Sequence, residues 1–72
     1  MSGSHRRLNK KVTARQREIM LIVAEGVSNK EIAQRLNITE GTVKIHLHQI
    51  YRHLGISNRT ALTAFVYGGR AD

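Results

Sequence analysis

Apolar residues recur at intervals of three and four along most of this chain, which is the spacing that places them on one face of a helix. The pattern is clearest over residues 40–54, where four apolar residues form one stripe: Val43, Leu47, Ile50 and Leu54. Apolar and polar residues do not alternate as they would in a half-buried strand, and proline is absent. The pattern therefore predicts an all-α fold.

Polar residues at the expected helix ends predict two helices joined by a tight turn over residues 28–54. Ser28 and Glu31 have the spacing of a capping box, in which each side chain bonds the backbone N–H of the other residue. The short helix that follows carries three apolar residues: Ile32, Ala33 and Leu36. Asn37 tolerates the left-handed conformation that often ends a helix, and Thr39 can cap the second helix. This layout is that of a helix-turn-helix.

A preceding helix is predicted by a second potential capping box, formed by Thr13 and Gln16. Gly26 is suited to end this helix, because glycine readily adopts the left-handed conformation. Its inner stripe is expected to be Ile19, Ile22 and Val23, with Met20 and Leu21 at the flanks.

A fourth helix is expected over residues 59–67, capped by Asn58 after Gly55 ends the long helix. Leu62 and Val66 are four residues apart and can close the domain core. Three apolar residues then face elsewhere: Ala61, Ala64 and Phe65. A short helix that is apolar on more than one side needs a second partner, so this face predicts a dimer contact.

The other face of the long helix has an unusual composition. It carries one isoleucine among a glycine, cations and a histidine: Gly41, Lys44, Ile45, His48 and Arg52. The only acid of this helix is Glu40, at its start. An exposed isoleucine among hydrogen-bond donors suits the edge of a DNA groove, where it can meet a thymine methyl group while its neighbours reach bases and phosphates. The alternative is a solvated face with one stray apolar residue.

Composition supports a polyanionic partner. Twelve Lys and Arg residues against five Asp and Glu residues give a net charge of +7, and the sequence pI is near 10.9. Such a balance favours DNA, RNA or an acidic membrane surface. The chain has no cysteine, which excludes disulfides and thiolate metal sites. No apolar run approaches the roughly 20 residues that span a bilayer, and no signal peptide is recognisable, so a cytoplasmic protein is expected.

Seventy-two residues allow one small domain, which we place at residues 12–67. Residues 1–11 begin with MSGSH, which looks like the remnant of an expression tag, and continue as a basic segment. This segment is interpreted as a flexible linker, and an arm that touches DNA is the alternative. Residues 68–72 are expected to form a frayed tail.

Candidate catalytic and metal-binding groups are poorly placed. His46 and His48 are two residues apart, which points them to different sides of a helix, and no suitable acid pairs with either. No Ser or Thr has an evident base, and no glycine-rich phosphate loop follows a strand. We therefore expect no metal, no cofactor and no enzymatic activity. His46 lies beside the core stripe and is interpreted as a packed, hydrogen-bonded residue, with a phosphate contact as the alternative.

Arg15 and Arg17 occupy the first turn of the first helix, where the helix dipole disfavours positive charge. Glu18 offsets part of this cost. Cations at this position make sense if a phosphate lies nearby, so Arg15 is a candidate phosphate ligand. The alternative is an exposed charge without a partner.

Four motifs lie between Val12 and Tyr67. They are T-x-R-x-x-E from Thr13, GVSNKEIA over residues 26–33, TVKIH over residues 42–46 and LGISNR over residues 54–59. Together they resemble the DNA-binding domain of LuxR-type transcription regulators, including the NarL/FixJ response regulators.

This resemblance implies a four-helix domain whose third helix, residues 40–54, enters the major groove of double-stranded DNA. It implies a homodimer contact through the fourth helix. Base-reading positions of the NarL branch match Lys44, Ile45 and His48. Positions that commonly approach phosphates match Asn29, Lys30, Thr42 and His46, to which the outer-face cation Arg52 is added. An upstream receiver or ligand-sensing domain is expected in the full-length protein, and RNA polymerase is a candidate partner.

The sequence departs from the NarL branch at His48, where that branch often has lysine. This departure leaves the target sequence open. Region four of sigma factors has similar L-T-x-R-x-R-E and G-T-V-K motifs, but it lacks the following L-G-x-x-x-R and the fourth helix. A basic helical module that binds RNA or an acidic protein is the alternative from another functional class.

Overall fold

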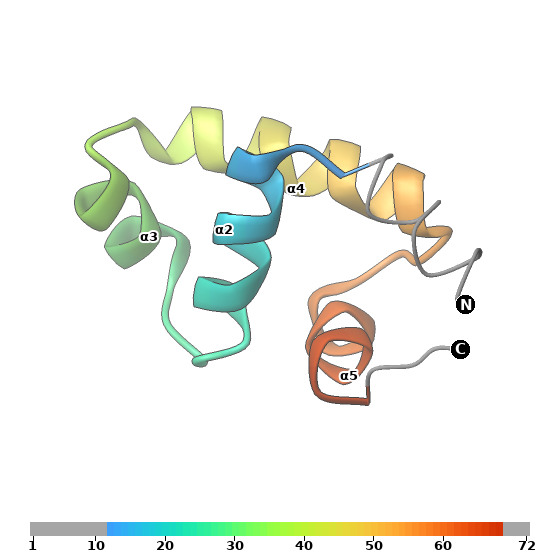
Figure 1. Ribbon diagram of the computed structural model, residues 1–72. Helices are drawn as coiled ribbons and strands as arrows, with labels where there is room; N and C mark the ends of the chain where they lie inside the picture. Colours follow the sequence, from blue (N-terminus) through green and yellow to red (C-terminus); the bar gives the residue numbers. More distant parts are fainter. Residues whose placement is uncertain (1–11, 69–72) are drawn as a thin grey trace.

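The computed structural model describes residues 12–68, which form four helices and no strand (Figure 1). Their bounds are α2 (Ala14–Val23), α3 (Asn29–Leu36), α4 (Glu40–Leu54) and α5 (Arg59–Gly68). The predicted all-α class and helix order are confirmed. Gly68 closes α5 and is not part of a tail. The tag remnant, the basic segment at residues 1–11 and the tail at residues 69–72 lie outside the described residues.

The caps that open α2 and α5 are formed as expected. The Thr13 hydroxyl accepts from the Gln16 backbone N–H at 3.0 Å, and the Thr13 N–H donates to Gln16 Oε1 at 3.1 Å. Both halves of this capping box are therefore present, and each uses a backbone N–H that the helix cannot pair itself. Asn58 Oδ1 accepts from the Ala61 N–H at 2.8 Å.

The capping box predicted at α3 is only half formed. The Ser28 hydroxyl accepts from the Glu31 N–H at 3.1 Å. The Glu31 carboxylate does not return to Ser28, however, because it bonds the Arg35 guanidinium one turn later, at 3.0 Å. Arg35 also donates to the Glu25 carboxylate, at 2.8 Å. The prediction was wrong on this point because a charge-assisted bond to arginine outcompetes a bond to a backbone N–H.

A left-handed residue makes the turn between α3 and α4. Asn37 has φ 58° and ψ 47°, as its position after Leu36 predicts. Thr39 follows in an extended conformation and caps α4 by accepting from the Thr42 N–H at 3.0 Å. Gly55 ends α4 with φ 71°, again in the left-handed region. These residues fix where α4 begins and ends.

The core lies where the four helices meet. It contains ten buried apolar residues: Val12, Ile19, Met20, Val23, Ile32, Ala33, Val43, Leu47, Ile50 and Leu62. Two assignments on α2 are corrected, since Met20 is 7% exposed and belongs to the core, whereas Ile22 is only partly buried. Phe65 also packs partly against the core instead of facing away from it. Leu54 and Val66 pack at its edge.

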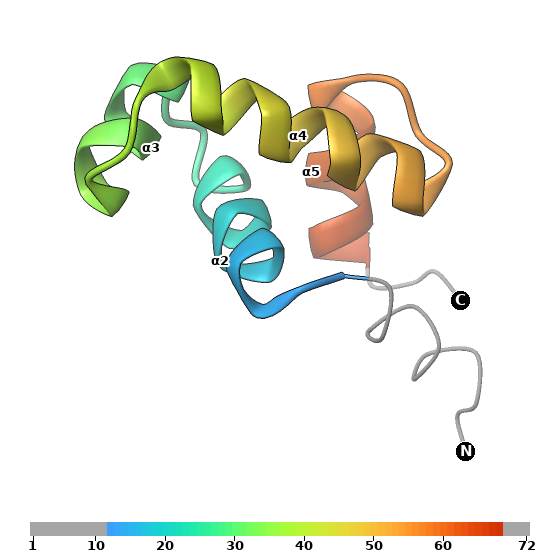
Figure 2. The ribbon, with the colours of Figure 1, turned by 90° about the horizontal axis from the view of Figure 1, so that it is seen from above.

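The helices are arranged so that α4 lies across the others (Figures 1 and 2). α3 packs against α4, and α2 packs against both α4 and α5. α5 is tied to the end of α2 by Tyr67, whose hydroxyl donates to the Ala24 carbonyl at 2.7 Å. Because α5 is seated on α2, the outer face of α4 stays open to solvent.

Candidate nucleic-acid interface

The outer face of α4 carries the residues that the sequence placed there. Ile45 is 60% exposed, while Val43 and Leu47 on the same helix are buried. Lys44 and His48 are exposed beside Ile45, and Arg52 is exposed about a turn further on. The inward and outward faces of α4 are therefore as expected. An exposed isoleucine has no packing role here, so it is available to a partner.

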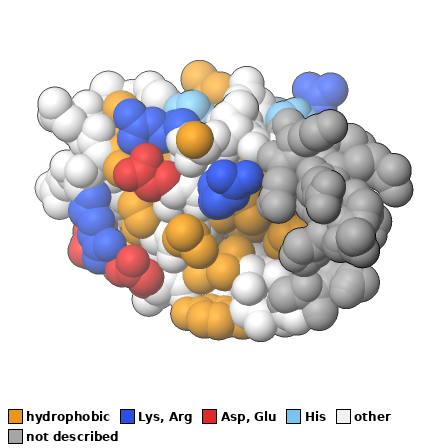
Figure 3. Space-filling view, in the orientation of Figure 1, with side chains coloured by type: hydrophobic (Ala, Val, Ile, Leu, Met, Phe, Trp, Pro, Cys, Tyr) orange, Lys and Arg blue, Asp and Glu red, His pale blue; other side chains and the backbone are white. Residues whose placement is uncertain are grey.

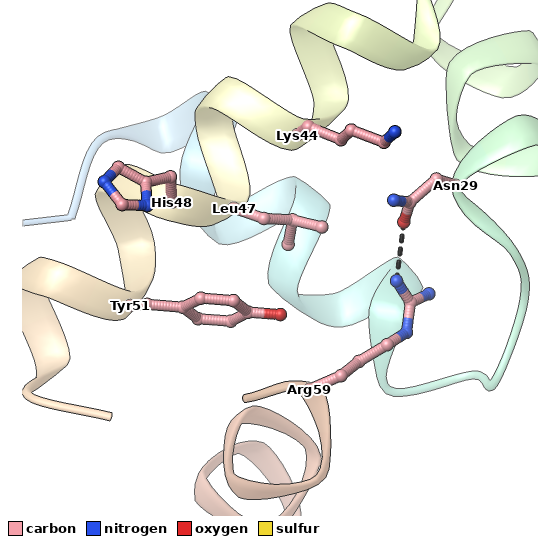
Figure 4. Close-up of a pocket in the computed structure, with 6 residues that line it drawn as sticks. All are labelled: Asn29, Lys44, Leu47, His48, Tyr51 and Arg59. Atoms are coloured by element: carbon pink, nitrogen blue, oxygen red, sulfur yellow. Dashed lines mark hydrogen bonds between the residues drawn. The ribbon is translucent and has the colours of Figure 1, made fainter. Parts of the chain in front are cut away.

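Beside this face lies a shallow groove where α4 meets the first turns of α3 and α5 (Figure 4). Its volume is about 330 Å³. Six residues line it: Asn29, Lys44, Leu47, His48, Tyr51 and Arg59. Figure 4 shows the Lys44 side chain extending toward Asn29, the Tyr51 hydroxyl pointing toward Arg59, and Leu47 between them. No carboxylate lines this groove, so its polar lining suits an anion.

Arg59 connects the groove to the backbone of the α2–α3 turn. One guanidinium nitrogen donates to Asn29 Oδ1 at 2.5 Å, and the other donates to the Val27 carbonyl. Arg59 was predicted only as part of a motif, and no role was predicted for Tyr51. The only local sign was an arginine in a first helical turn that contains no acid. Asn29 and Arg59 are 30 residues apart, so no local pattern could pair them.

The other candidate phosphate ligands differ in how freely their side chains can be used. Lys30 is exposed in the first turn of α3, where backbone N–H groups are also unpaired. The Thr42 hydroxyl lies 2.9 Å from that of Thr39 and forms part of the α4 cap. A phosphate contact by Thr42 would have to share this hydroxyl.

His46 is half-buried, as its place beside the core stripe predicts. Its Nδ1 atom is buried, however, and has no hydrogen-bond partner among the described residues. The expected hydrogen-bonded histidine is therefore wrong for this nitrogen. The position of a residue on a helix flank predicts its burial, but it does not determine whether a polar group of another helix lies within reach of Nδ1.

Arg15 is paired with an acid on its own helix. Its guanidinium lies 3.5 Å from Glu18, and both side chains are about half exposed. The alternative of an exposed charge without a partner is therefore wrong. A long, solvated pair of this kind contributes little to stability, so Arg15 can still reorient toward an anion.

Acidic residues are grouped away from the outer face of α4. Glu25 and Glu31 both bind Arg35, and these bonds, the one to Glu25 first, raise the pKa of the Arg35 guanidinium above its ordinary value. Figure 3 shows acidic side chains adjoining basic ones on the face that it displays. Within residues 12–68, Glu40 is the one acid on α4, and it lies in the first turn. The rest of the outer face therefore presents positive charge without a nearby carboxylate of its own helix.

Among the described residues, no three His, Cys, Asp or Glu side chains are grouped closely enough to hold a metal ion. None of the four helices is long and apolar enough to cross a membrane.

Comparison with known proteins agrees with this geometry. Residues 10–66 match the family described as bacterial regulatory proteins, luxR family. The chain belongs to this family. It is 57% identical over 51 residues to the putative HTH-type transcriptional regulator YhjB of Escherichia coli, covering 71% of this chain and 26% of that protein. This family membership and the four-helix fold confirm the resemblance on which the site residues were chosen.

Two further relatives carry descriptions as regulators. The nitrate/nitrite response regulator protein NarL of Escherichia coli is 37% identical over 59 residues, which are 82% of this chain and 27% of NarL. The transcriptional regulatory protein LiaR of Bacillus subtilis is 38% identical over 66 residues, which are 92% of this chain and 31% of LiaR. The chain thus spans about a quarter to a third of the length of these three relatives.

Proposed function

We propose that this domain binds double-stranded DNA at specific sequences, with α4 in the major groove, as the effector domain of a bacterial transcription regulator. The observation that carries the proposal is the exposed Ile45 between Lys44 and His48, on a helix face without acid after Glu40. An α-helix fits the major groove of B-DNA, where the thymine methyl group and the guanine acceptors are within reach of such side chains.

The exposed residues divide into two roles. Lys44, Ile45 and His48 read bases, because they lie on the outermost strip of α4. Contacts to phosphate position the domain and come from Asn29, Lys30, Thr42, His46, Arg52 and Arg15. Within this set, Asn29 and Lys30 have the strongest support, since both sit in the first turn of α3, where the helix dipole favours an anion.

We further propose that α5 forms a homodimer contact on DNA. Ala64 is exposed, and Ala61 and Phe65 are partly exposed beside it. Because Phe65 also packs against the core, the apolar face left for a partner is small. Stable interfaces bury on the order of 1,200 Å² or more, so a monomer in dilute solution and a dimer on two half-sites is the expected behaviour.

The activity of the whole protein extends beyond this domain. The relatives are three to four times as long as the matched segment, and NarL is described as a response regulator. We infer a non-enzymatic, cytoplasmic regulator with an upstream receiver or ligand-sensing domain, and with RNA polymerase as a partner at promoters. The family match favours this function over a region-four-like role in a sigma factor.

Selection from a random duplex library tests the proposal without knowledge of the target. The domain should enrich a short motif, and a duplex carrying two copies should bind more tightly than DNA with one copy. Duplex RNA of the same sequence should bind far more weakly, because its deep, narrow major groove does not admit a helix. Equal affinity for the RNA, or a library without enrichment, would point to a basic module that binds polyanions without reading bases.

A further inference from the structure

We propose that Arg59 is a positioning residue, which orients the Asn29 side chain so that the groove beside α4 binds one phosphate of the DNA backbone. The inference rests on the proposed DNA binding and adds a defined site to it. The donors of this site are the Asn29 amide nitrogen, the Lys44 ammonium group and the Tyr51 hydroxyl. Arg59 does not bond the phosphate itself and instead orients Asn29 through its hydrogen bond to Asn29 Oδ1.

Arg59 determines which way the Asn29 amide points. An arginine side chain carries only donors, so the Asn29 atom that it bonds must be the oxygen. Arg59 donates to this oxygen at 2.5 Å, and the amide nitrogen is consequently turned away from Arg59. Figure 4 shows this nitrogen on the side of the groove where the Lys44 side chain ends. Without Arg59, the amide would be free to turn its acceptor toward the groove.

Arg59 is itself held in place by a second acceptor. Its guanidinium also donates to the Val27 carbonyl, and the residue is partly buried at the start of α5. Two acceptors spaced for the two ends of a guanidinium hold it in one plane, which a lysine cannot reproduce. Both acceptors are uncharged oxygens. The positive charge therefore remains and raises the electrostatic potential of the groove.

The lining of the groove suits a phosphate group as its ligand. Three donors from α3 and α4 converge on a groove that has no carboxylate in its lining, and Leu47 excludes water from part of it. Phosphate oxygens accept several such bonds at once. The groove of the protein adjoins His48 and Lys44 on the outer face of α4. When α4 lies in the major groove of a duplex, the DNA backbone therefore passes this point. We therefore assign the ligand to a backbone phosphate rather than to free phosphate.

A methylphosphonate scan of the selected duplex tests the site. Each phosphate near the α3 end of the half-site is replaced in turn by a neutral methylphosphonate. With the unaltered domain, one position should weaken binding on the order of tenfold, as expected for a lost hydrogen bond to a charged group. Inorganic phosphate should shift the Asn29 side-chain amide signal in NMR only at concentrations far above those at which the duplex does so.

Asn29→Asp removes the amide nitrogen that would donate to the phosphate and keeps the oxygen that accepts from Arg59. Aspartate keeps an oxygen for Arg59 and favours the first turn of α3, so the melting temperature should not fall. It also aims a negative charge at the proposed phosphate. We expect the preference at this one position to invert, so that the methylphosphonate duplex binds better than the natural duplex. An unchanged preference for phosphate would overturn the site.

Arg59→Lys keeps the charge and should keep the fold, but it should lose most of the sensitivity to that phosphate because the amide is no longer held. Arg59→Met should lose the same sensitivity and weaken binding further, because it also removes the charge. Combining Arg59→Lys with Asn29→Ala should cost no more than Asn29→Ala alone. Arg52→Met is the matched control and should retain the sensitivity at this position. If Arg59 variants instead lower the melting temperature and keep the sensitivity, Arg59 acts only on stability. Enrichment of a motif from the library would stand in either case.

Discussion

The side chain of Gln16 in α2 donates to Gln49 Oε1 in α4 at 3.2 Å while its own oxygen closes the cap at Thr13. Gln16 is 4% exposed and is the one buried polar residue of the described chain. It therefore links the start of α2 to the helix proposed to read DNA.

Removal of this side chain should destabilise the fold through both bonds. We expect Gln16→Ala to lower the free energy of unfolding by about 1–3 kcal/mol, because it deletes half of the capping box and leaves a cavity at the α2–α4 contact. Gln49→Ala removes only the bond between helices and should cost about 0.5–1.5 kcal/mol. Urea denaturation of the unaltered domain and of the two variants measures both losses. Equal losses for the two variants would mean that the cap contributes nothing.

Ile45→Ser tests base reading. The residue is exposed and isoleucine and serine have similar helix propensities, so the melting temperature should hardly change. Loss of the apolar contact should relax the preference at one or two base pairs by ~1 kcal/mol or more. Lys44→Ala should reduce both affinity and discrimination at an adjacent pair. A panel of single-base variants of the selected duplex, measured beside thermal melts, distinguishes these effects. A destabilised domain with intact base preference would mean that Ile45 acts on stability and not on base reading.

The phosphate contacts predict a strong dependence on salt. Binding should weaken steeply between roughly 50 and 200 mM salt, with a log–log slope of about −0.9 for each phosphate neutralised. Lys30→Ala should make the slope shallower by about 0.9 and should weaken all duplexes alike, since Lys30 is proposed to contact a phosphate and not a base. Anisotropy titrations at several salt concentrations give the slope. A flat response would remove the electrostatic basis of the proposal.

Ala64→Glu tests the dimer contact through α5. Ala64 is exposed, so a charge there should leave the fold and the affinity for a single half-site nearly unchanged. Cooperative binding to two half-sites should disappear, because two carboxylates would be buried against each other across the interface. Ala64→Ser changes the size little and should keep the cooperativity. Gel shifts on one-site and two-site duplexes measure both quantities, and cooperative binding by the glutamate variant would exclude this face.

Gly41 is expected to lower the stability of the fold and to favour DNA binding. A Cβ atom built there meets only Thr39 Oγ1, at 3.8 Å, so the fold has room for alanine. Gly41→Ala should raise the free energy of unfolding by up to ~1 kcal/mol and the melting temperature by several degrees. If the DNA backbone lies against the first turn of α4, the same change weakens binding. Gly68→Ala, at another open helical position, should alter stability without affecting binding. Tighter binding by Gly41→Ala would exclude close approach at this turn.

Local spacing and cap chemistry were sufficient to predict most of the fold. Val43, Leu47 and Ile50 are buried and Ile45 is exposed because a helix of known period can place only one of these sets inward. Asn37 was predictable for a similar reason, since few residues tolerate its backbone conformation. The helix boundaries followed from the same local signals.

Features that depend on packing between helices were not predictable in this way. Met20 is buried in the core, whereas Ile22 is only partly buried. The helical period shows which residues share a face, but the way α2 packs against its neighbours determines which side of that face is buried. The bond from Arg59 to Asn29 joins residues on different helices. The Glu31 carboxylate could bond either the Ser28 N–H or Arg35, and it bonds Arg35. Such choices depend on distances that exist only after the helices have packed.

The separation of the two faces of α4 has an evolutionary consequence. Val43, Leu47 and Ile50 maintain the fold, while Ile45 and His48 contribute nothing to the core. Substitutions at positions 45 and 48 are therefore nearly neutral for folding and accumulate without compensating changes elsewhere. If these positions read bases as proposed, a gene duplicate of this domain can acquire a new operator in a few mutational steps. A laboratory library randomised at these two positions should consist largely of folded members.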